Sequence, residues 1–261
     1  MHSTINFMHF SSEQLDTFRQ SGYLVVPGLA TADQLGAIRA QAEQALGLEP
    51  RPLELESDVG YPGAPQDQQD EGGNTPRRLL QAFARGGAFQ AWARSPAVVG
   101  RVAELLESPR VMLCQSHHNC LMTKFPRYSS DTLWHRDTRY WSFEPPFLVN
   151  AWLALGREVP ENGGMTIIPG SHRWDLQPDQ VDQAQFLRMD HPANAAALEA
   201  AVQADLDPGD VLFFNARVFH AASRNSSDRV KLSLVFSYYG GGTRPLPGTK
   251  SASQPPVQLT P

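Results

Sequence analysis

The alternation of apolar and polar residues predicts helices in the first part of the chain and short strands in the remainder. Ser11 caps a short predicted helix, which Gly22 ends before a β-rich run at residues 23–26. Thr31, with Gln34 three residues later, forms a capping box, and apolar residues then recur on one face of the helix that it opens. We expect this amphipathic helix to support a sheet.

Residues 50–75 interrupt the helical pattern. They are dense in Pro, Gly, Asp and Gln and have almost no periodicity, so they predict a long surface loop, which we interpret as a lid. Helical periodicity returns at residues 79–93 and again at 96–106, where Pro96 suits the first position of a helix. A helical support at about residues 10–107 is therefore predicted.

The rest of the chain predicts short strands separated by turns. The predicted strands are residues 111–125, 132–140, 147–155, 165–169, 211–214, 218–222 and 230–239. Turn signals such as Asn162-Gly163-Gly164 lie between them. Many short strands indicate a mainly β fold with flanking helices, a sandwich or jelly-roll barrel, with its core at about 110–240 and a polar tail at 241–261.

Composition narrows the class of protein and of partner. The chain has 261 residues, of which 41% are hydrophobic and 19% charged, which is typical of a folded globular protein, and we expect one domain. The formal net charge of -5 is spread without long runs of one sign, so no basic stripe is present for a nucleic-acid backbone. Small molecules are the expected partners.

Location and assembly are also expectations at this point. Cys114 and Cys120 are six residues apart in a predicted strand, which disfavours a bridge and favours two reduced thiols. No window approaches the roughly 18 apolar residues of a membrane span, and no basic segment precedes an apolar run at the start. We predict a cytoplasmic protein without a membrane partner, and a monomer because no coiled-coil pattern is present.

The sequence Trp134-His135-Arg136-Asp137 carries the strongest chemical signal. Residues two apart in a strand project to the same face, so His135 and Asp137 converge. Two histidines and one carboxylate on one face of a metal are the ligands associated with non-haem Fe(II) oxygenases. A second histidine is required from another strand, and the candidates are His117, His118, His172, His191 and His220. His220 is the best placed, because it ends a short apolar strand.

Several motifs in a fixed order resemble the phytanoyl-CoA dioxygenase family of Fe(II)/2-oxoglutarate-dependent oxygenases. They are the segment 18–26 (FRQSGYLVV), Lys124-Phe125-Pro126, the His135-Arg136-Asp137 segment, Trp152-Leu153-Ala154-Leu155, the segment 161–172 (ENGGMTIIPGSH), Pro208-Gly209-Asp210, His220 and Asn225. The resemblance covers about residues 10–239. It implies a single oxygenase domain with a double-stranded β-helix (jelly-roll, cupin-like) core, and Fe(II) with 2-oxoglutarate and O₂ as co-substrates. It also implies that His135, Asp137 and His220 are the catalytic metal ligands.

The sequence departs from this family at the co-substrate anchor. The family usually has an arginine eleven residues after the distal histidine, and Lys231 stands there. Lysine can pair with a carboxylate as a point charge, and Ser233 falls on the same strand face. Arg229 has the same parity as Lys231 and is a second candidate, and Lys124 is a third. The alternative for Lys231 is a solvated strand lysine.

Strand parity also suggests substrate contacts. Arg139 and Trp141 continue the parity of His135 and Asp137, so they line the pocket if that strand continues. The alternatives are a surface ion pair for Arg139 and core packing for Trp141. Further candidates for the pocket wall are Gln115, His117, Asn119 and Tyr238. The Gly, Asn and Pro residues of segment 161–172, and His172, are assigned to turn geometry.

The resemblance implies hydroxylation of an aliphatic C–H bond, with release of succinate and CO₂. Halogenases of this class lack the carboxylate ligand, so Asp137 favours hydroxylation over halogenation. Desaturation, epoxidation and ring formation stay open, as does the substrate, because family membership does not imply an acyl-CoA. Two alternatives also stay open. One is a non-catalytic jelly-roll protein that binds a small molecule, and the other is a metal enzyme that does not use 2-oxoglutarate.

Overall fold

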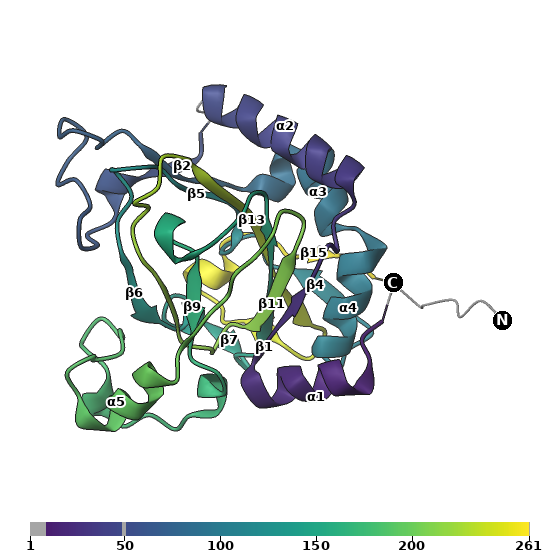
Figure 1. Ribbon diagram of the computed structural model, residues 1–261. Helices are drawn as coiled ribbons and strands as arrows, with labels where there is room; N and C mark the ends of the chain where they lie inside the picture. Colours follow the sequence, from purple (N-terminus) through teal and green to yellow (C-terminus); the bar gives the residue numbers. More distant parts are fainter. Residues whose placement is uncertain (1–8, 49–50, 261) are drawn as a thin grey trace.

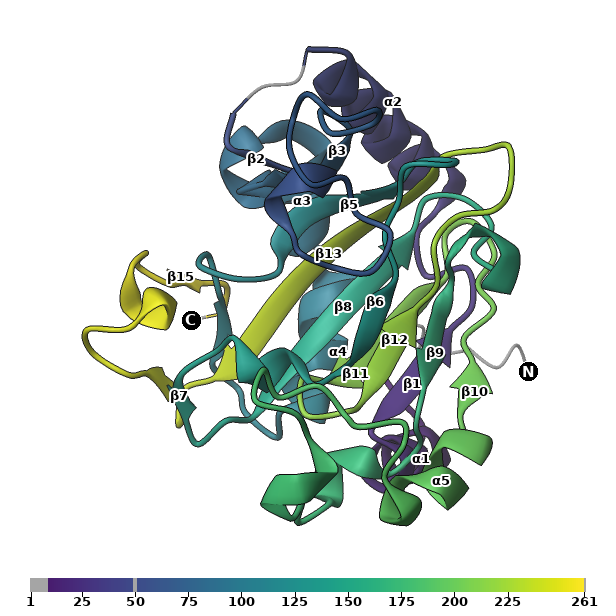
Figure 2. The same ribbon diagram turned by 90° about the vertical axis from the view of Figure 1, so that its left-hand side faces the viewer.

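Two antiparallel sheets packed face to face form the centre of the protein, whose computed structural model describes residues 9–48 and 51–260. The larger sheet has, in spatial order, β1 (Tyr23–Val26), β11 (Val211–Asn215), β8 (Leu148–Ala154), β13 (Lys231–Gly240), β5 (Asn119–Lys124), β3 (Pro76–Leu80) and β2 (Leu53–Leu55), with β4 (Val111–Leu113) beside β13 and β15 (Val257–Gln258) beside β4. The smaller sheet has β10 (Val202–Gln203), β9 (Met165–Ile167), β12 (His220–Ala222) and β6 (Thr132–His135). Figure 2 shows the smaller sheet in front of the larger one.

Helices cover the outer face of the larger sheet. They are α1 (Ser12–Ser21), α2 (Ala32–Leu48), α3 (Gly87–Ala93) and α4 (Pro96–Leu105), and they lie on the side away from the smaller sheet (Figure 1). A fifth helix, α5 (Pro192–Glu199), lies apart from them, and β7 (Phe143–Glu144) pairs with β14 (Arg244–Pro245). This arrangement confirms the prediction of a mainly β fold with flanking helices. No helix in the described part of the chain is both long and apolar enough to cross a membrane.

Residue parity in β13 separates two apolar cores. Leu234, Phe236 and Tyr238 are fully buried in the core between the larger sheet and the helices. Val235 belongs instead to the core between the two sheets. Because side chains alternate across a strand, Lys231 and Ser233 also face the smaller sheet. One face of β13 thus packs against the helices, and the other brings Lys231 and Ser233, together with Val235, to the space between the sheets.

The predicted helix caps are present. Ser11 Oγ accepts a hydrogen bond from the backbone of Gln14, whose side chain accepts one from the backbone of Ser11. Gly22 ends α1 with φ 81°, a conformation that glycine adopts without a Cβ clash. Thr31 and Gln34 make the same reciprocal pair at the start of α2. These local signals are satisfied by neighbouring residues, which is why the sequence was sufficient to find them.

Strand pairing changes three of the predicted elements. The strand expected at 111–125 is two strands, because residues 114–118 leave the sheet between β4 and β5. The helix expected at 79–93 begins as β3 and a short 3₁₀ turn before α3. The loop expected at 50–75 contains β2, which pairs with β3. In each case a long-range strand pairing decides the conformation, and sequence periodicity does not report such pairings.

The tail after residue 240 is packed against the protein. Arg244 pairs with Glu144, Val257 with Leu113 and Gln258 with Met112 in antiparallel register. Between these strands, residues Lys250–Ala252 form a 3₁₀ turn. The tail therefore forms part of the fold, although its composition predicted only a polar extension.

Candidate metal centre

Two histidines lie side by side on neighbouring strands. His135 ends β6 and His220 begins β12, and they are register partners. The Nδ1–H of His135 donates to the carbonyl of Leu133 at 2.7 Å, and that of His220 donates to the carbonyl of Val218 at 3.0 Å. A carbonyl oxygen only accepts, so each ring carries its proton on Nδ1 and presents the lone pair of Nε2. Both Nε2 atoms are therefore oriented to bind a metal ion.

Asp137 completes this group. Its Oδ1 lies 3.7 Å from Nε2 of His135 and 3.7 Å from Nε2 of His220. One ligand atom from each residue lies within 4.8 Å of the others, and all three residues are buried. Two imidazoles and one carboxylate on the same side of a point match the ligand set of non-haem Fe(II) oxygenases.

Asp137 reaches this position from a turn and not from a strand. β6 ends at His135, and Asp137–Arg139 form a 3₁₀ turn, so the strand predicted at 132–140 is wrong beyond residue 135. The parity argument therefore does not explain why the dyad converges. The turn directly follows the strand and directs the carboxylate back toward the ring of His135.

His118 and Asn150 hold the Asp137 carboxylate from two sides. His118 Nε2 lies 3.0 Å from Oδ1, and Asn150 Nδ2 donates to Oδ2 at 2.6 Å. Burial by itself would lower the pKa of His118, but the carboxylate outweighs it and raises that pKa to about 9. Burial by itself would raise the pKa of Asp137, but His118 and His220 hold it well below its usual value. Asp137 is therefore an anion with a defined orientation.

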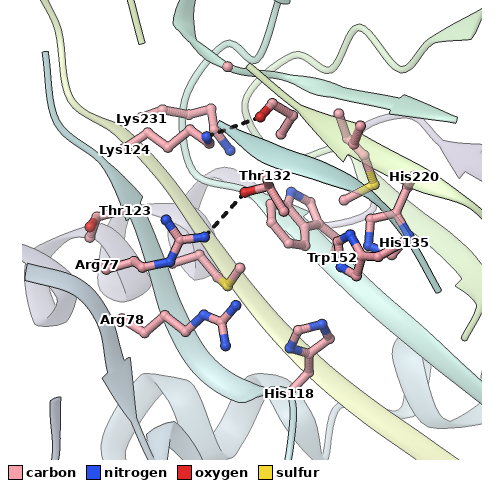
Figure 3. A pocket seen from close by; sticks show the side chains of 15 residues that line it. Arg77, Arg78, His118, Thr123, Lys124, Thr132, His135, Trp152, His220 and Lys231 are labelled. Carbon is pink, nitrogen blue, oxygen red and sulfur yellow. Dashed lines mark hydrogen bonds between the residues drawn. The ribbon is translucent and has the colours of Figure 1, made fainter. Parts of the chain in front are cut away.

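A narrow cavity of about 50 Å³ extends from the two histidines to a group of cations. Figure 3 shows Lys124 and Lys231 at one end, His135 and His220 at the other, and the Trp152 ring between them. Two arginines, Arg77 and Arg78, line the side of the cavity. A linear dianion with one end at the metal would place its other end at the lysines.

Lys231 and Ser233 are buried together at this far end. Lys231 Nζ donates to Glu158 Oε2 at 3.0 Å and to Ser233 Oγ at 3.2 Å. Ser233 Oγ donates in turn to Glu158 Oε1 at 2.6 Å. Lys231 is only 5% exposed, so it is not the solvated strand lysine that the sequence left open.

Lys124 lies beside Lys231 with different partners. Its Nζ donates to the carbonyl oxygens of Ser130 at 2.8 Å and Ser223 at 2.6 Å, and more weakly to that of Ala222 at 3.4 Å. Carbonyls bear no net charge. Burial, together with the charges of Arg77 and Lys231, lowers the pKa of Lys124 to about 7.

A second, larger cavity of about 400 Å³ opens on the other side of the metal centre. Three of the residues predicted from the sequence as substrate contacts line it, and they are Gln115, His117 and Trp141. His117 stacks on Trp141 with 5.0 Å between ring centroids, and its Nε2 lies 2.7 Å from Ser251 Oγ. Both cavities share the wall formed by Arg78, His118 and His135.

The long loop and the tail close this larger cavity. Val59 and Tyr61 of the loop line it, and the Tyr61 hydroxyl lies 2.5 Å from that of Tyr140. Lys250 and Gln254 of the tail line it as well. The lid expected from residues 50–75 therefore forms one wall of the cavity, and the tail forms another.

The family model described as Phytanoyl-CoA dioxygenase (PhyH) matches residues 18–233. The chain belongs to this family. A probable phytanoyl-CoA dioxygenase of Caenorhabditis elegans is 23% identical, over 87% of this chain and 75% of the relative. The peroxisomal phytanoyl-CoA dioxygenase of Rattus norvegicus is 24% identical, over 94% of this chain and 72% of the relative.

Solved structures show the same fold. EctD from S. alaskensis with bound Fe has a TM-score of 0.74 and 20% identity, covering 100% of this chain and 86% of that one. The epimerase SnoN, in complex with Fe3+, alpha ketoglutarate and nogalamycin RO, has a TM-score of 0.71 and 22% identity, covering 94% of this chain and 92% of that one. The predicted family, jelly-roll fold and dioxygenase class are thus confirmed.

Several predicted residues of this family member lie away from the two cavities. Arg229 precedes β13, so strand parity does not apply to it, and its side chain is 91% exposed beside Asp228. Tyr238 has the opposite parity to Lys231, and its hydroxyl donates to the carbonyl of Ala93 under the helices. The structure therefore does not bring Arg229 or Tyr238 to the site.

Arg139 and Asn119 were predicted to line the pocket, and neither does. Arg139 packs over the ring of Phe186 at 3.6 Å and donates to the Tyr140 hydroxyl at 2.7 Å, so it supports the rim of the larger cavity without lining it. The Asn119 side chain accepts a hydrogen bond from the backbone of Phe83, on the helix side of the sheet. The break at residues 114–118 removes the alternation on which the Asn119 prediction depended.

Other residues of the site were not found by sequence reasoning. They are Arg77, Arg78, Trp152, Asn150, Glu158 and, as a contact of Asp137, His118. The first two lie in β3, between the loop predicted at 50–75 and the helix predicted at 79–93. Trp152 was noticed only as part of a family motif, and its alternation with Asn150 in β8 was the available signal.

Proposed function

We propose that this chain is an Fe(II)/2-oxoglutarate-dependent dioxygenase that hydroxylates an aliphatic C–H bond of a small molecule, with release of succinate and CO₂. One observation carries this proposal. Two imidazole Nε2 atoms and a carboxylate oxygen converge within 4.8 Å beside a cavity that ends in two lysines. That arrangement offers a metal site and, at the far end of the cavity, positive charge for a dianionic co-substrate.

His135, Asp137 and His220 would hold the iron. Their donor atoms suit Fe(II), and the backbone carbonyls that accept from both Nδ1–H groups fix the rings in the required tautomer. Bound iron with 2-oxoglutarate would supply the oxidative chemistry, as cofactors generally do, and the protein supplies binding, orientation and exclusion of water. Burial of all three side chains serves that exclusion.

The narrow cavity is the proposed co-substrate site. Lys231 and Lys124 would hold the C5 carboxylate of 2-oxoglutarate, with Ser233 supporting Lys231 from behind, and the Trp152 ring would form the wall along the methylene groups. Lysine makes point-charge contacts and lacks the two-pronged geometry of arginine, so several donors must act together. The third N–H of Lys231, beyond those directed at Glu158 and Ser233, remains for the co-substrate.

The larger cavity is the proposed substrate site, with Gln115, His117 and Trp141 as contacts. A volume of about 400 Å³ lies at the lower end of small-molecule pockets. Its lining mixes aromatic rings with amides and hydroxyls, and this favours a compact substrate that carries hydrogen-bonding groups. An acyl-coenzyme A would have to leave most of its length outside, so we do not propose one.

The pairing of Lys231 with Glu158 favours one alternative. If Glu158 satisfied this lysine permanently, the centre would act as a metal site that does not use 2-oxoglutarate. The non-catalytic binding protein is the other alternative. Binding of 2-oxoglutarate and formation of succinate separate both from the proposed dioxygenase.

The test is an anaerobic Fe(II) titration followed by 2-oxoglutarate. Wild type should give a visible charge-transfer band and, after O₂ is admitted, succinate, whereas His135→Ala should give neither. His9→Ala removes an exposed histidine and is the matched control. A wild-type protein that binds iron without a band would favour the enzyme that does not use 2-oxoglutarate, and a band without succinate would favour the binding protein.

Location and assembly are part of the same proposal. We propose a monomer in the cytosol, although the rat relative is peroxisomal by name. Fractionation of cells that produce the tagged protein tests the location, and sedimentation of the purified protein tests the assembly.

A further inference from the structure

Glu158 is a buried carboxylate behind the lysine end of the co-substrate cavity, where it contacts Lys231 and Trp152 of the cavity lining. It is fully buried, and it accepts hydrogen bonds from Lys231 at 3.0 Å and Ser233 at 2.6 Å. The indole Nε1–H of Trp152 donates to both of its oxygens, at 3.1 and 3.2 Å. All three side chains are among those that we assign to the co-substrate site.

The backbone holds Glu158 in this place. Its N–H donates to the carbonyl of Leu206 at 2.8 Å, and its carbonyl accepts from the N–H of Leu206 at 3.0 Å. A residue fixed by a pair of backbone hydrogen bonds cannot withdraw without breaking them. The backbone of Glu158 is therefore fixed, and the hydrogen bonds from Lys231, Ser233 and Trp152 hold its carboxylate beside Lys231.

The charges at this end of the cavity can be counted from the contacts. Glu158 neutralises Lys231, Glu56 neutralises Arg77 through an ion pair of 3.2 Å, and Glu54 neutralises Arg78 through one of 3.3 Å. Lys124 donates only to carbonyl oxygens. One net positive charge, on Lys124, therefore remains for an incoming carboxylate.

We propose that Glu158 is a built-in counter-ion of Lys231 that weakens the binding of 2-oxoglutarate and leaves Lys124 to balance the charge of its C5 carboxylate. This inference rests on the proposed function. The fixed negative charge of Glu158 repels the incoming carboxylate. The protein therefore discriminates less strongly between a 2-oxo acid that has a distal carboxylate and one that lacks it. The affinity for co-substrate is thus set by the pair Glu158 and Lys231 and not by Lys231 alone.

The decisive comparison uses two ligands on the anaerobic Fe(II) protein. 2-Oxoglutarate and 2-oxovalerate share a five-carbon 2-oxo acid, but only the first has a distal carboxylate. Glu158→Gln should bind 2-oxoglutarate about tenfold more tightly than wild type, because a charge a few ångströms away in the interior is removed. Its affinity for 2-oxovalerate should change by less than about twofold, since that ligand has no second charge.

Glu161→Gln is the matched control, because Glu161 is an exposed carboxylate three residues further along the chain. It should leave the affinities for both ligands unchanged. Equal or weaker binding of 2-oxoglutarate by Glu158→Gln would overturn the inference. Failure of wild type itself to form the 2-oxoglutarate complex would overturn the proposed function, and the inference with it.

A second set of variants covers the case in which Glu158→Gln does not fold. Lys231→Met leaves the buried Glu158 without its charged partner, close to the ligand site. The double variant Lys231→Met with Glu158→Met removes both charges. The double variant should bind 2-oxoglutarate at least about tenfold more tightly than the single one. Equal binding by the two would overturn the inference.

Discussion

His118 Nε2 lies 3.0 Å from Asp137 Oδ1, the same oxygen that lies 3.7 Å from Nε2 of His135 and of His220. The ligand oxygen thus faces the two metal-binding nitrogens while a third imidazole holds it from behind. Asn150 binds the second oxygen. The carboxylate is oriented before any metal is present, and this orientation should increase the affinity for the metal.

Asn150→Ala tests that orientation. The variant removes the donor to Asp137 Oδ2, so Fe(II) affinity should fall by roughly 10–100-fold, the usual effect of losing a partner of a metal ligand. Anaerobic Fe(II) titration measures it. Ser237→Ala, which removes only the hydroxyl that donates to Asn150, should have a smaller effect. Unchanged Fe(II) affinity in Asn150→Ala would show that Asp137 needs no such support.

Gly163→Ala should weaken both the fold and the binding of 2-oxoglutarate. At φ 77° an added Cβ would lie 2.4 Å from the carbonyl oxygen of Ser223 and 2.5 Å from Cδ of Lys124. We expect a loss of about 1–3 kcal/mol in the free energy of unfolding, from left-handed strain and the clash with backbone. Denaturant unfolding and the charge-transfer titration measure the two effects.

Gly156→Ala is the matched control for that variant. A Cβ at Gly156 would meet nothing within 4 Å, and its φ is not in the left-handed region. We expect unfolding and 2-oxoglutarate binding close to wild type. If Gly163→Ala also unfolded and bound 2-oxoglutarate like wild type, the close approach of Gly163 to Lys124 would affect neither stability nor binding.

Binding of 2-oxoglutarate should depend on pH through Lys124, whose pKa burial lowers to about 7. The charged groups that act on it are Arg77 and Lys231, which lower the pKa, and Glu56 and Asp131, which raise it. Well below pH 7 Lys124 is charged, and the affinity for 2-oxoglutarate is at its maximum. Above pH 7 the free protein must take up a proton on binding, so affinity should fall by up to about tenfold per pH unit.

The charge-transfer titration between pH 7 and 9 measures this dependence. Lys124→Met should bind more weakly than wild type at pH 7 and show no loss over the same range. A wild-type affinity that is constant from pH 7 to 9 would contradict the assignment of Lys124 as the cation that balances the co-substrate.

Phe213→Ala should destabilise the core between the larger sheet and the helices. The Phe213 side chain is fully buried, and its ring meets that of Phe10 edge-on at 5.8 Å. We expect a loss of about 3–5 kcal/mol in the free energy of unfolding, since the variant leaves a cavity in packed surroundings. Leu48→Ala, at a site that is 71% exposed, should cost less than about 0.5 kcal/mol. Similar losses in both variants would mean that Phe213 is not part of a packed core.

The sequence by itself determined the features that depend on near neighbours. The caps of α1 and α2 and the positions of β1, β8 and β11 follow from residues a few positions apart, whose interactions are local. It also indicated the group His135, Asp137 and His220, because the motif order of the family was preserved. Parity within an unbroken strand placed Lys231 and Ser233 correctly on one face.

Only the tertiary structure decided how those residues are surrounded. Glu158 meets Lys231 across 73 residues, and Arg77 meets Ser130 across 53 residues. Neither pair leaves a periodic trace in the sequence. Where a strand ended early, as after His135, parity stopped predicting side-chain direction. The place where a strand ends, and the charges that are buried together, depend on contacts between residues far apart in the chain. Those contacts contribute free energy only when the sheets pack together.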